Sequence, residues 1–97
     1  MRYNLTEKLK FSDDPVLVIK KNELTVNSDA ETVLQLMDIL REKGEIAGAR
    51  EAMSLLLSPA DLEKLSALRL KMDDYIEVMK AAVQLAMGTD PDETAGE

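Results

Sequence analysis

Two pairs of adjacent acidic residues, Asp13-Asp14 and Asp73-Asp74, are the candidates in this sequence for general acid–base chemistry. That chemistry needs two carboxyl groups that converge on one substrate. The first pair precedes Pro15, an order typical of a turn, and the second falls in the first turn of an expected helix, where acids stabilise the helix dipole. Neighbouring residues on a helix point about 100° apart, so they do not share a substrate. Both pairs are therefore predicted to have structural roles.

The 97-residue sequence contains neither cysteine nor histidine. Their absence removes thiol nucleophiles, imidazole bases and the usual zinc ligands. A serine–lysine hydrolase needs neither cysteine nor histidine, and Ser54, Ser58 and Ser66 have lysines nearby in the sequence. None of the three lies in a glycine-rich turn of the kind that exposes a nucleophile. We therefore expect no enzymatic activity and no catalytic residues.

Among metal sites, the spacing of the acidic residues comes nearest to a calcium-binding loop. Asp90, Asp92 and Thr94 match its first, third and fifth positions, but glycine, required at the sixth position, stands at the seventh as Gly96. The four glycines are also scattered, so no loop is expected to cradle a phosphate. We expect no metal site and no cofactor-binding site, and interpret residues 89–97 as a flexible acidic tail.

The charge balance limits the classes of partner. Twelve basic and 19 acidic residues give a net charge of −7, and four of the acids lie after Gly88. Nucleic acid needs clustered lysine and arginine, which this sequence lacks. No apolar run approaches the roughly 18 residues of a membrane span, and residues 1–10 have no signal-peptide core. We expect a cytoplasmic protein that binds neither nucleic acid nor membrane.

A β-hairpin is the first element predicted to build the fold. Two strand-like runs, 16–20 and 23–27, flank Lys21-Asn22, and asparagine tolerates the positive φ of a tight turn. One face is then apolar and the other mixed, and helices must cover the apolar face. The predicted cross-strand pairs are Lys20 with Glu23, Ile19 with Leu24, Val18 with Thr25, and Leu17 with Val26. Upstream, Asn4 to Glu7 favours a single helical turn, although Leu9 and Phe11 could instead alternate in a short strand.

Helical spacing of apolar residues follows the hairpin. The predicted helices run from a capping box at Ser28 and Glu31 to Gly44, over 45–57, from Ser58-Pro59 onward, and from near Met72 to Gly88. A hairpin followed by three to four helices predicts the α+β class. We expect a single domain over residues 1–88, with the acidic tail at 89–97.

Six methionines stand among the 97 residues, and two interpretations remain open for them. They could fill the core, or they could form an adaptable surface that grips a partner helix. Under the second interpretation, the predicted partner-binding residues are Val18 and Thr25 on the outer strand face, and Tyr75, Met79 and Val83 on the last helix. Self-association could also use Ala47-Gly48-Ala49 or the open edges of the hairpin.

Several runs together resemble the tail assembly chaperones of long-tailed phages and prophages of Gram-positive bacteria. In the N-terminal half these are residues 4–11, 14–19 and 26–30, with Val33-Leu34 after them. In the C-terminal half they are residues 57–59, 64–65, 68–70, 74–75 and 82–88, with the acidic tail. The resemblance covers about residues 4–93. Lys71 departs from it, because such proteins often place a serine or threonine helix cap there.

The resemblance implies a non-enzymatic role. Chaperones of this family escort the tape-measure protein, keep its helical stretches soluble and recruit tail-tube subunits around it. In several phages a ribosomal frameshift adds a longer form, which here would diverge near Gly88. The family carries over no catalytic positions. The alternative function is a small regulatory or adaptor module of a phage or prophage that binds another folded protein.

Overall fold

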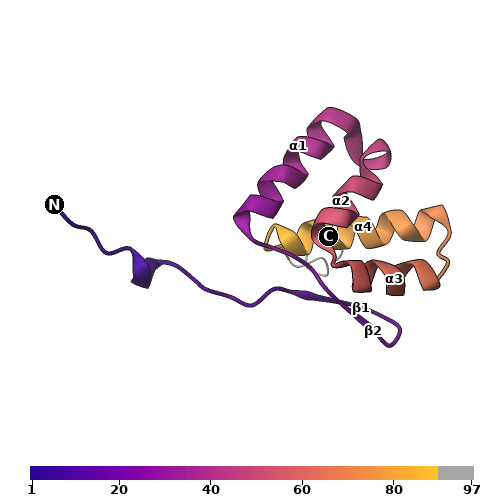
Figure 1. The fold of residues 1–97 in the computed structure, drawn as a ribbon, viewed down its shortest axis with the longest axis horizontal. Coiled ribbons are helices and arrows are strands. Elements are labelled where there is room, and N and C mark those ends of the chain that lie inside the picture. The colour runs from indigo at the N-terminus through magenta and orange to yellow at the C-terminus, as the bar shows by residue number, and fades with distance from the viewer. Residues whose placement is uncertain (90–97) are drawn as a thin grey trace.

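The computed structural model describes residues 1–89 and has an extended N-terminal arm, a β-hairpin and four helices (Figure 1). The elements are the 3-10 helix η1 (Thr6–Lys8), strands β1 (Val16–Ile19) and β2 (Asn22–Thr25), and helices α1 (Ala30–Ala47), α2 (Ala49–Leu56), α3 (Pro59–Ala67) and α4 (Met72–Ala86). The predicted α+β class, a hairpin packed on helices, is confirmed. The predicted tail lies almost entirely outside the described residues. None of the helices within residues 1–89 combines the length and apolar character needed to cross a membrane.

The hairpin has the predicted faces but a different register. Leu17 pairs with Leu24 and Ile19 with Asn22, so the two-residue turn is Lys20-Lys21 and not Lys21-Asn22. Lys20 takes the positive φ of 57° that the turn requires. The predicted pairing is therefore wrong by a slip of two residues. A slip of two preserves which side chains face the core, because side chains alternate with period two, so the apolar pattern could not distinguish the registers.

Helix α3 covers the outer edge of β2. The backbone N–H of Thr25 donates to Oδ2 of Asp61 at 3.0 Å, and Lys64 lies 3.4 Å from the other carboxylate oxygen of Asp61. Lys64 also reaches the carbonyl oxygen of Glu23 at 3.5 Å. Asp61 is 9% exposed, and its partners compensate the cost of burying a carboxylate. Helix α3 thereby protects one strand edge from pairing with other chains.

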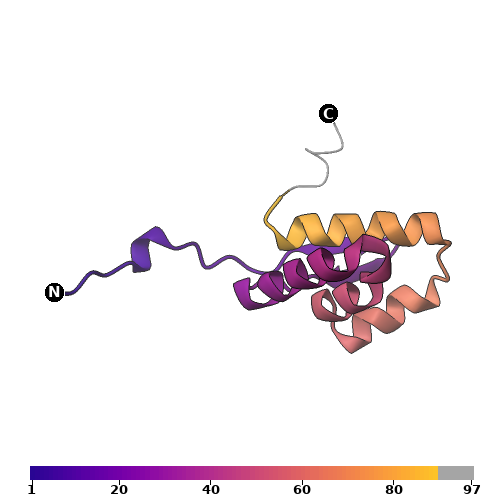
Figure 2. The same cartoon turned by 90° about the horizontal axis from the view of Figure 1, so that it is seen from above.

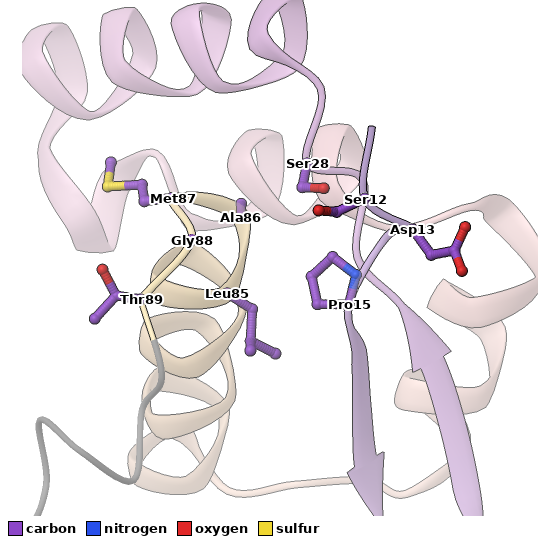
Figure 3. Close-up of a pocket in the computed structure, with 9 residues that line it drawn as sticks. All are labelled: Ser12, Asp13, Pro15, Ser28, Leu85, Ala86, Met87, Gly88 and Thr89. Carbon is purple, nitrogen blue, oxygen red and sulfur yellow. The ribbon is translucent and has the colours of Figure 1, made fainter. Parts of the chain in front are cut away.

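The start of α1 differs by one residue from the prediction. Asp29, not Ser28, is the N-cap, and its carboxylate accepts the backbone N–H of Thr32 at 3.2 Å. Ser28 instead donates its hydroxyl to Asp14 at 2.8 Å, a contact between residues far apart in sequence (the region appears in Figure 3). Both residues are good caps, so the tertiary bond to Asp14 decides between them.

The other helix boundaries follow local backbone chemistry. Ser58 accepts the N–H of Asp61 and Pro59 opens α3, as predicted. Helix α4 begins at Met72, as predicted, and Gly88 follows it with a φ of 84°. The backbone N–H of Asn27 donates to the carbonyl oxygen of Leu56, and its side-chain amide donates to that of Leu55. The chain after β2 therefore supplies hydrogen-bond donors to two carbonyl groups at the C-terminal end of α2. Residues 45–57, predicted as one helix, are divided at Gly48: residues 45–47 form the end of α1 beyond the kink at Gly44, and α2 covers Ala49–Leu56.

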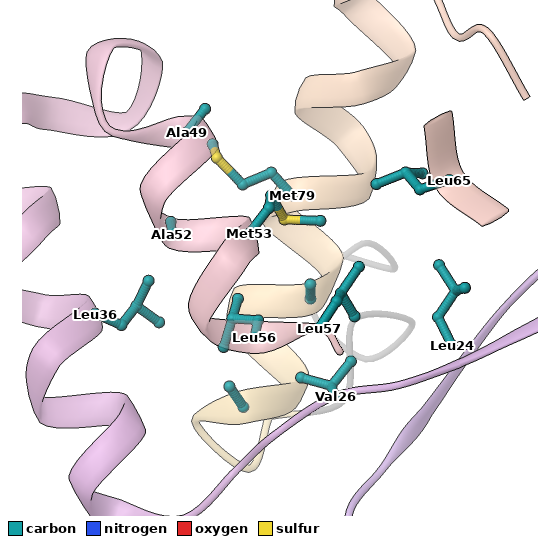
Figure 4. Packing of buried hydrophobic residues seen from close by; sticks show 12 residues of the cluster. Leu24, Val26, Leu36, Ala49, Ala52, Met53, Leu56, Leu57, Leu65 and Met79 are labelled. Carbon is teal, nitrogen blue, oxygen red and sulfur yellow. The ribbon is translucent and has the colours of Figure 1, made fainter. Parts of the chain in front are cut away.

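The core forms where α2 meets the other elements (Figure 4). Helix α2 packs on α1, α3 and α4, and the apolar face of the hairpin contributes the buried Leu24 and Val26. The fully buried large side chains are Leu24, Val26, Leu36, Met53, Leu56, Leu57 and Met79. Two of these are methionines, so core filling accounts for part of the methionine content.

Candidate protein-binding surface

A corner built by two glycines shapes the surface between α1 and α4. Gly44 interrupts α1 with φ 82° and ψ 173°, a conformation that essentially only glycine adopts. A Cβ on Gly48 would lie 2.8 Å from the carbonyl oxygen of Gly44 and 2.9 Å from Cγ2 of Ile39. Lys43 and Glu51 form an ion pair that joins α1 to α2 across the corner. The corner turns Ile46 outward, and its side chain is 68% exposed.

Two separate hollows lie along α4 beside this corner. The first, about 350 Å³, is lined by Ile46, Ala47, Ala49, Arg50, Leu70, Met72 and Tyr75. The second, about 210 Å³, is lined by Leu40, Glu45, Met79, Lys80, Val83 and Gln84. Tyr75 and Met79 are one helical turn apart, as Met79 and Val83 are, so the two hollows follow one face of α4. We call these two hollows together the α4 groove.

The α4 groove brings together three of the five residues that the sequence singled out. Tyr75 and Val83 are half-buried in its walls, whereas Met79 is 1% exposed and belongs to the core beneath it. Met79 therefore supports the groove and offers little surface of its own to a partner. The spacing of four along one helix was sufficient to group these residues.

The two predicted strand residues lie elsewhere. Val18, which is 60% exposed, and Thr25, also exposed, point away from the helices on the outer face of the hairpin. They are diagonal neighbours, because Val16 pairs with Thr25 and Val18 with Glu23. The structure does not join this strand pair to the α4 groove.

Sequence reasoning missed the most exposed parts of the groove. Ile46 and Met72, which is 53% exposed, were not among the predicted partner-binding residues. The signal that could have identified Ile46 is its position between Gly44 and Gly48, where a helical stripe cannot continue unbroken. Gly48 and Ala49, considered for self-association, are buried against their own chain.

The acidic and serine candidates have local roles. Asp14 accepts from Ser28, Ser58 caps α3, and Ser54 donates to the carbonyl oxygen of Glu51. Asp73 and Asp74 occupy the first turn of α4, as predicted. Within residues 1–89, no three acidic side chains gather closely enough to hold a metal ion.

One carboxyl group has a shifted pKa. The Thr32 hydroxyl, and then its backbone N–H, donate to Asp29 and hold the pKa of that carboxyl below its ordinary 3.8. Asp29 caps α1 and lines neither part of the α4 groove, so the shift reports helix capping and marks no reactive group.

The α4 groove presents apolar side chains beneath a rim of both charges, with Glu45 near Lys80 and Arg50 farther along. Such a surface can bind an apolar helix or peptide without selecting strongly for charge. Comparisons of the chain with protein-family models, curated proteins and solved structures found no match.

Proposed function

We propose that this protein is a non-enzymatic tail assembly chaperone of a phage or prophage. In this proposal it binds the tape-measure protein in the cytoplasm of the bacterial host and helps to recruit tail-tube subunits. The observation that carries the proposal is the α4 groove, with Ile46 and Met72 exposed at its rim. The family resemblance of the sequence supplies the identity of the partner.

The dimensions of the groove suit a helix. Met72, Tyr75 and Val83 lie in a row on one face of α4 at helical spacing, and the buried Met79 supports the row from beneath. From Met72 to Val83 the row is about 16 Å long, or roughly three helical turns. A partner helix of that length can lay its apolar face along the row, as in other helix-in-groove complexes.

Methionine suits a partner whose sequence varies along its length. Its unbranched side chain adapts to differently shaped neighbours, so Met72 can contact successive apolar segments of a long helical protein. Covering Ile46 and Met72 would remove apolar surface from water, which favours binding by about 1–2 kcal/mol for each side chain. Binding of this strength for each contact is compatible with release during tail assembly.

Co-expression tests the proposal. The 97-residue chain would be tagged and co-expressed with the tape-measure protein of the same phage or prophage. The soluble fraction of the tape-measure protein would be compared with its soluble fraction when it is expressed alone. We expect the tape measure to become soluble and to co-purify with an excess of this chain. A tape measure that stays insoluble and unbound would contradict the proposal.

Paired variants locate the binding surface. Ile46→Asp combined with Met72→Asp should abolish co-purification, because two carboxylates would lose their hydration in an apolar contact. Leu34→Asp is the matched control, since Leu34 is 61% exposed on α1 and lines neither part of the groove. Circular dichroism would verify that all variants keep their helices. Equal loss in the control would place the binding surface elsewhere.

A further inference from the structure

The N-terminal arm, residues 1–14, extends away from the helices (Figures 1 and 2). Its apolar side chains are exposed. Phe11 is 81% exposed and Tyr3 70%, and Leu5 and Leu9 are about half exposed. Within the described residues, the first hydrogen bond from the arm to the rest of the chain is at Asp14, which accepts from Ser28. An arm of this composition would gain stability from a surface that covers Leu9 and Phe11.

The outer part of the arm, residues 1–12, and the remainder of the chain carry opposite net charges, whereas Asp13 and Asp14 bring the arm as a whole to zero. Residues 1–12 contain Arg2, Lys8 and Lys10 against one acid, Glu7. Residues 13–97 contain nine basic and 18 acidic residues, a net charge of −9. The acidic remainder of a second copy therefore attracts residues 1–12 electrostatically, whereas two such segments repel each other.

A groove with matching chemistry lies at the base of the arm (Figure 3). It measures about 620 Å³ and lies between the arm base, at Ser12 to Pro15, and the C-terminal end of α4, at Leu85 to Thr89. Its lining in the described part of the chain includes Asp13 and no lysine or arginine. The C-terminal end of the α4 dipole adds partial negative charge, which favours a cation. We call it the arm-root groove.

We propose that residues 9–11 of the arm dock in the arm-root groove of a second copy of the chain, and that the exchange is reciprocal around a two-fold axis. Phe11 and Leu9 are the apolar anchors beside Leu85 and Met87, and Lys10 faces the acidic side of the groove. Because the groove adjoins the base of each arm, one symmetric contact seats both arms at once.

The arm's own groove is a poor alternative. Ser12 and Asp13 line that groove, and Phe11 directly precedes them. Seating Phe11 in it would require a reversal of the chain within residues 11–14, which include no glycine. Reaching a second copy needs only the extended arm, since the four residues from Phe11 to Pro15 span up to about 14 Å. The bases of the two arms would accordingly lie close together.

Cysteine cross-linking tests the pairing, and the natural chain contains no cysteine to interfere. Full-length Lys8→Cys, at an exposed residue beside the docked segment 9–11, would be mixed under oxidising conditions with a larger, tagged Met87→Cys chain, or with tagged Leu34→Cys as control. Met87 and Leu34 are both exposed, at 46% and 61%, but only Met87 lines the groove. We expect the disulfide between positions 8 and 87 to form much faster than the one between positions 8 and 34, because the anchors Leu9 and Phe11 are kept. Equal rates would overturn the proposal.

A doubly substituted chain separates exchange from self-docking. If Lys8→Cys with Met87→Cys closes a disulfide within one chain while the mixed single variants stay unlinked, the arm docks on its own body and the proposal is wrong. If the mixed single variants link between chains, exchange is supported. The α4 groove and the arm-root groove share no lining residue among those described, so neither result depends on tape-measure binding.

Sedimentation of the variants measures the energetic contribution of the arm. We expect the natural chain to dimerise and Phe11→Ser to weaken the dimer by about tenfold or more. Lys10→Glu should weaken it as well, and added salt should reduce the difference between this variant and the natural chain. Val18→Ser, at a site 60% exposed on the hairpin, should leave the dimer unchanged. A natural chain that stays monomeric, or a dimer indifferent to Phe11, would contradict the proposal.

Discussion

Helices α1 and α2 are both amphipathic, but they differ in how much of the apolar face is covered. Half of the eight residues of α2 are buried, namely Ala49, Ala52, Met53 and Leu56. In the 18 residues of α1 only Leu36 is buried, while Leu34 and Met37 are more than half exposed. Helix α2 packs on three other helices, whereas α1 packs mainly on α2. The difference separates a supporting centre from a periphery whose apolar side chains remain exposed.

The same contrast extends along the chain. The inner face of the hairpin and the side of α4 toward α2 belong to the centre, whereas the N-terminal arm and the rim of the α4 groove belong to the periphery. Substitutions in the centre should therefore change the free energy of unfolding, and substitutions in the periphery should change binding.

Leu56→Ala should produce the largest loss of stability. Leu56 is fully buried, and truncating a buried leucine leaves a cavity that costs about 2–5 kcal/mol in the free energy of unfolding. Leu34→Ala, on the exposed side of α1, should cost less than about 0.5 kcal/mol. Urea unfolding followed by circular dichroism measures both. Similar losses would remove the distinction between centre and periphery.

Gly48→Ala should rank next, because it affects the joint between α1 and α2. Its new methyl group would lie 2.8 Å from the backbone oxygen of Gly44, which cannot move aside as a flexible side chain can. Overpacking of this kind costs about 1–3 kcal/mol. Ala47→Ser, at the neighbouring exposed residue, is the control and should be nearly neutral. If Gly48→Ala proved neutral under the same urea titration, the corner would be looser than the structure has it.

Sequence and structure agree where local backbone chemistry determines an element. Ser58-Pro59 opens α3, Gly44 breaks α1 and Gly88 follows α4, because capping and positive φ depend on few neighbours. The hairpin register was not predictable in this way, since either register leaves the same side chains on the apolar face. The cap of α1 depends on Asp14, which is distant in sequence.

The candidate site was predictable to a smaller extent. Spacing along α4 grouped Tyr75, Met79 and Val83, but it could not say which of them would reach the surface. That outcome depends on the opposite wall, where the glycine corner turns Ile46 outward. Amphipathic spacing identifies an apolar face and leaves open whether the same chain or another one covers it.

Asp61→Ala tests whether the edge of β2 belongs to the centre. The substitution removes the acceptor of the Thr25 N–H and the partner of Lys64, and an unsatisfied buried donor costs about 1–3 kcal/mol. Glu63→Ala, two residues along on the exposed side of α3, should change stability by less than about 0.5 kcal/mol. The two variants would be compared by thermal and urea unfolding. An equal effect would mean that α3 covers the strand edge without stabilising it.

The pH dependence at Asp29 should give the smallest effect and tests how firmly α1 is attached. The hydroxyl and N–H of Thr32 lower the pKa of Asp29 below its ordinary 3.8, so the folded state favours the carboxylate. The resulting stabilisation is present above the unfolded pKa and is lost as the pH falls through the folded pKa. Asp29→Asn removes this titration, so the stability difference between the natural chain and the variant should shrink from about pH 5 to about pH 3. Hydrogen exchange should show the loss first in the amides of α1, before those of α2, because α1 has the less covered face. Simultaneous loss of amide protection in both helices would mean that α1 and α2 unfold as one cooperative unit. The greater exposure of α1 would then not allow it to unfold before α2.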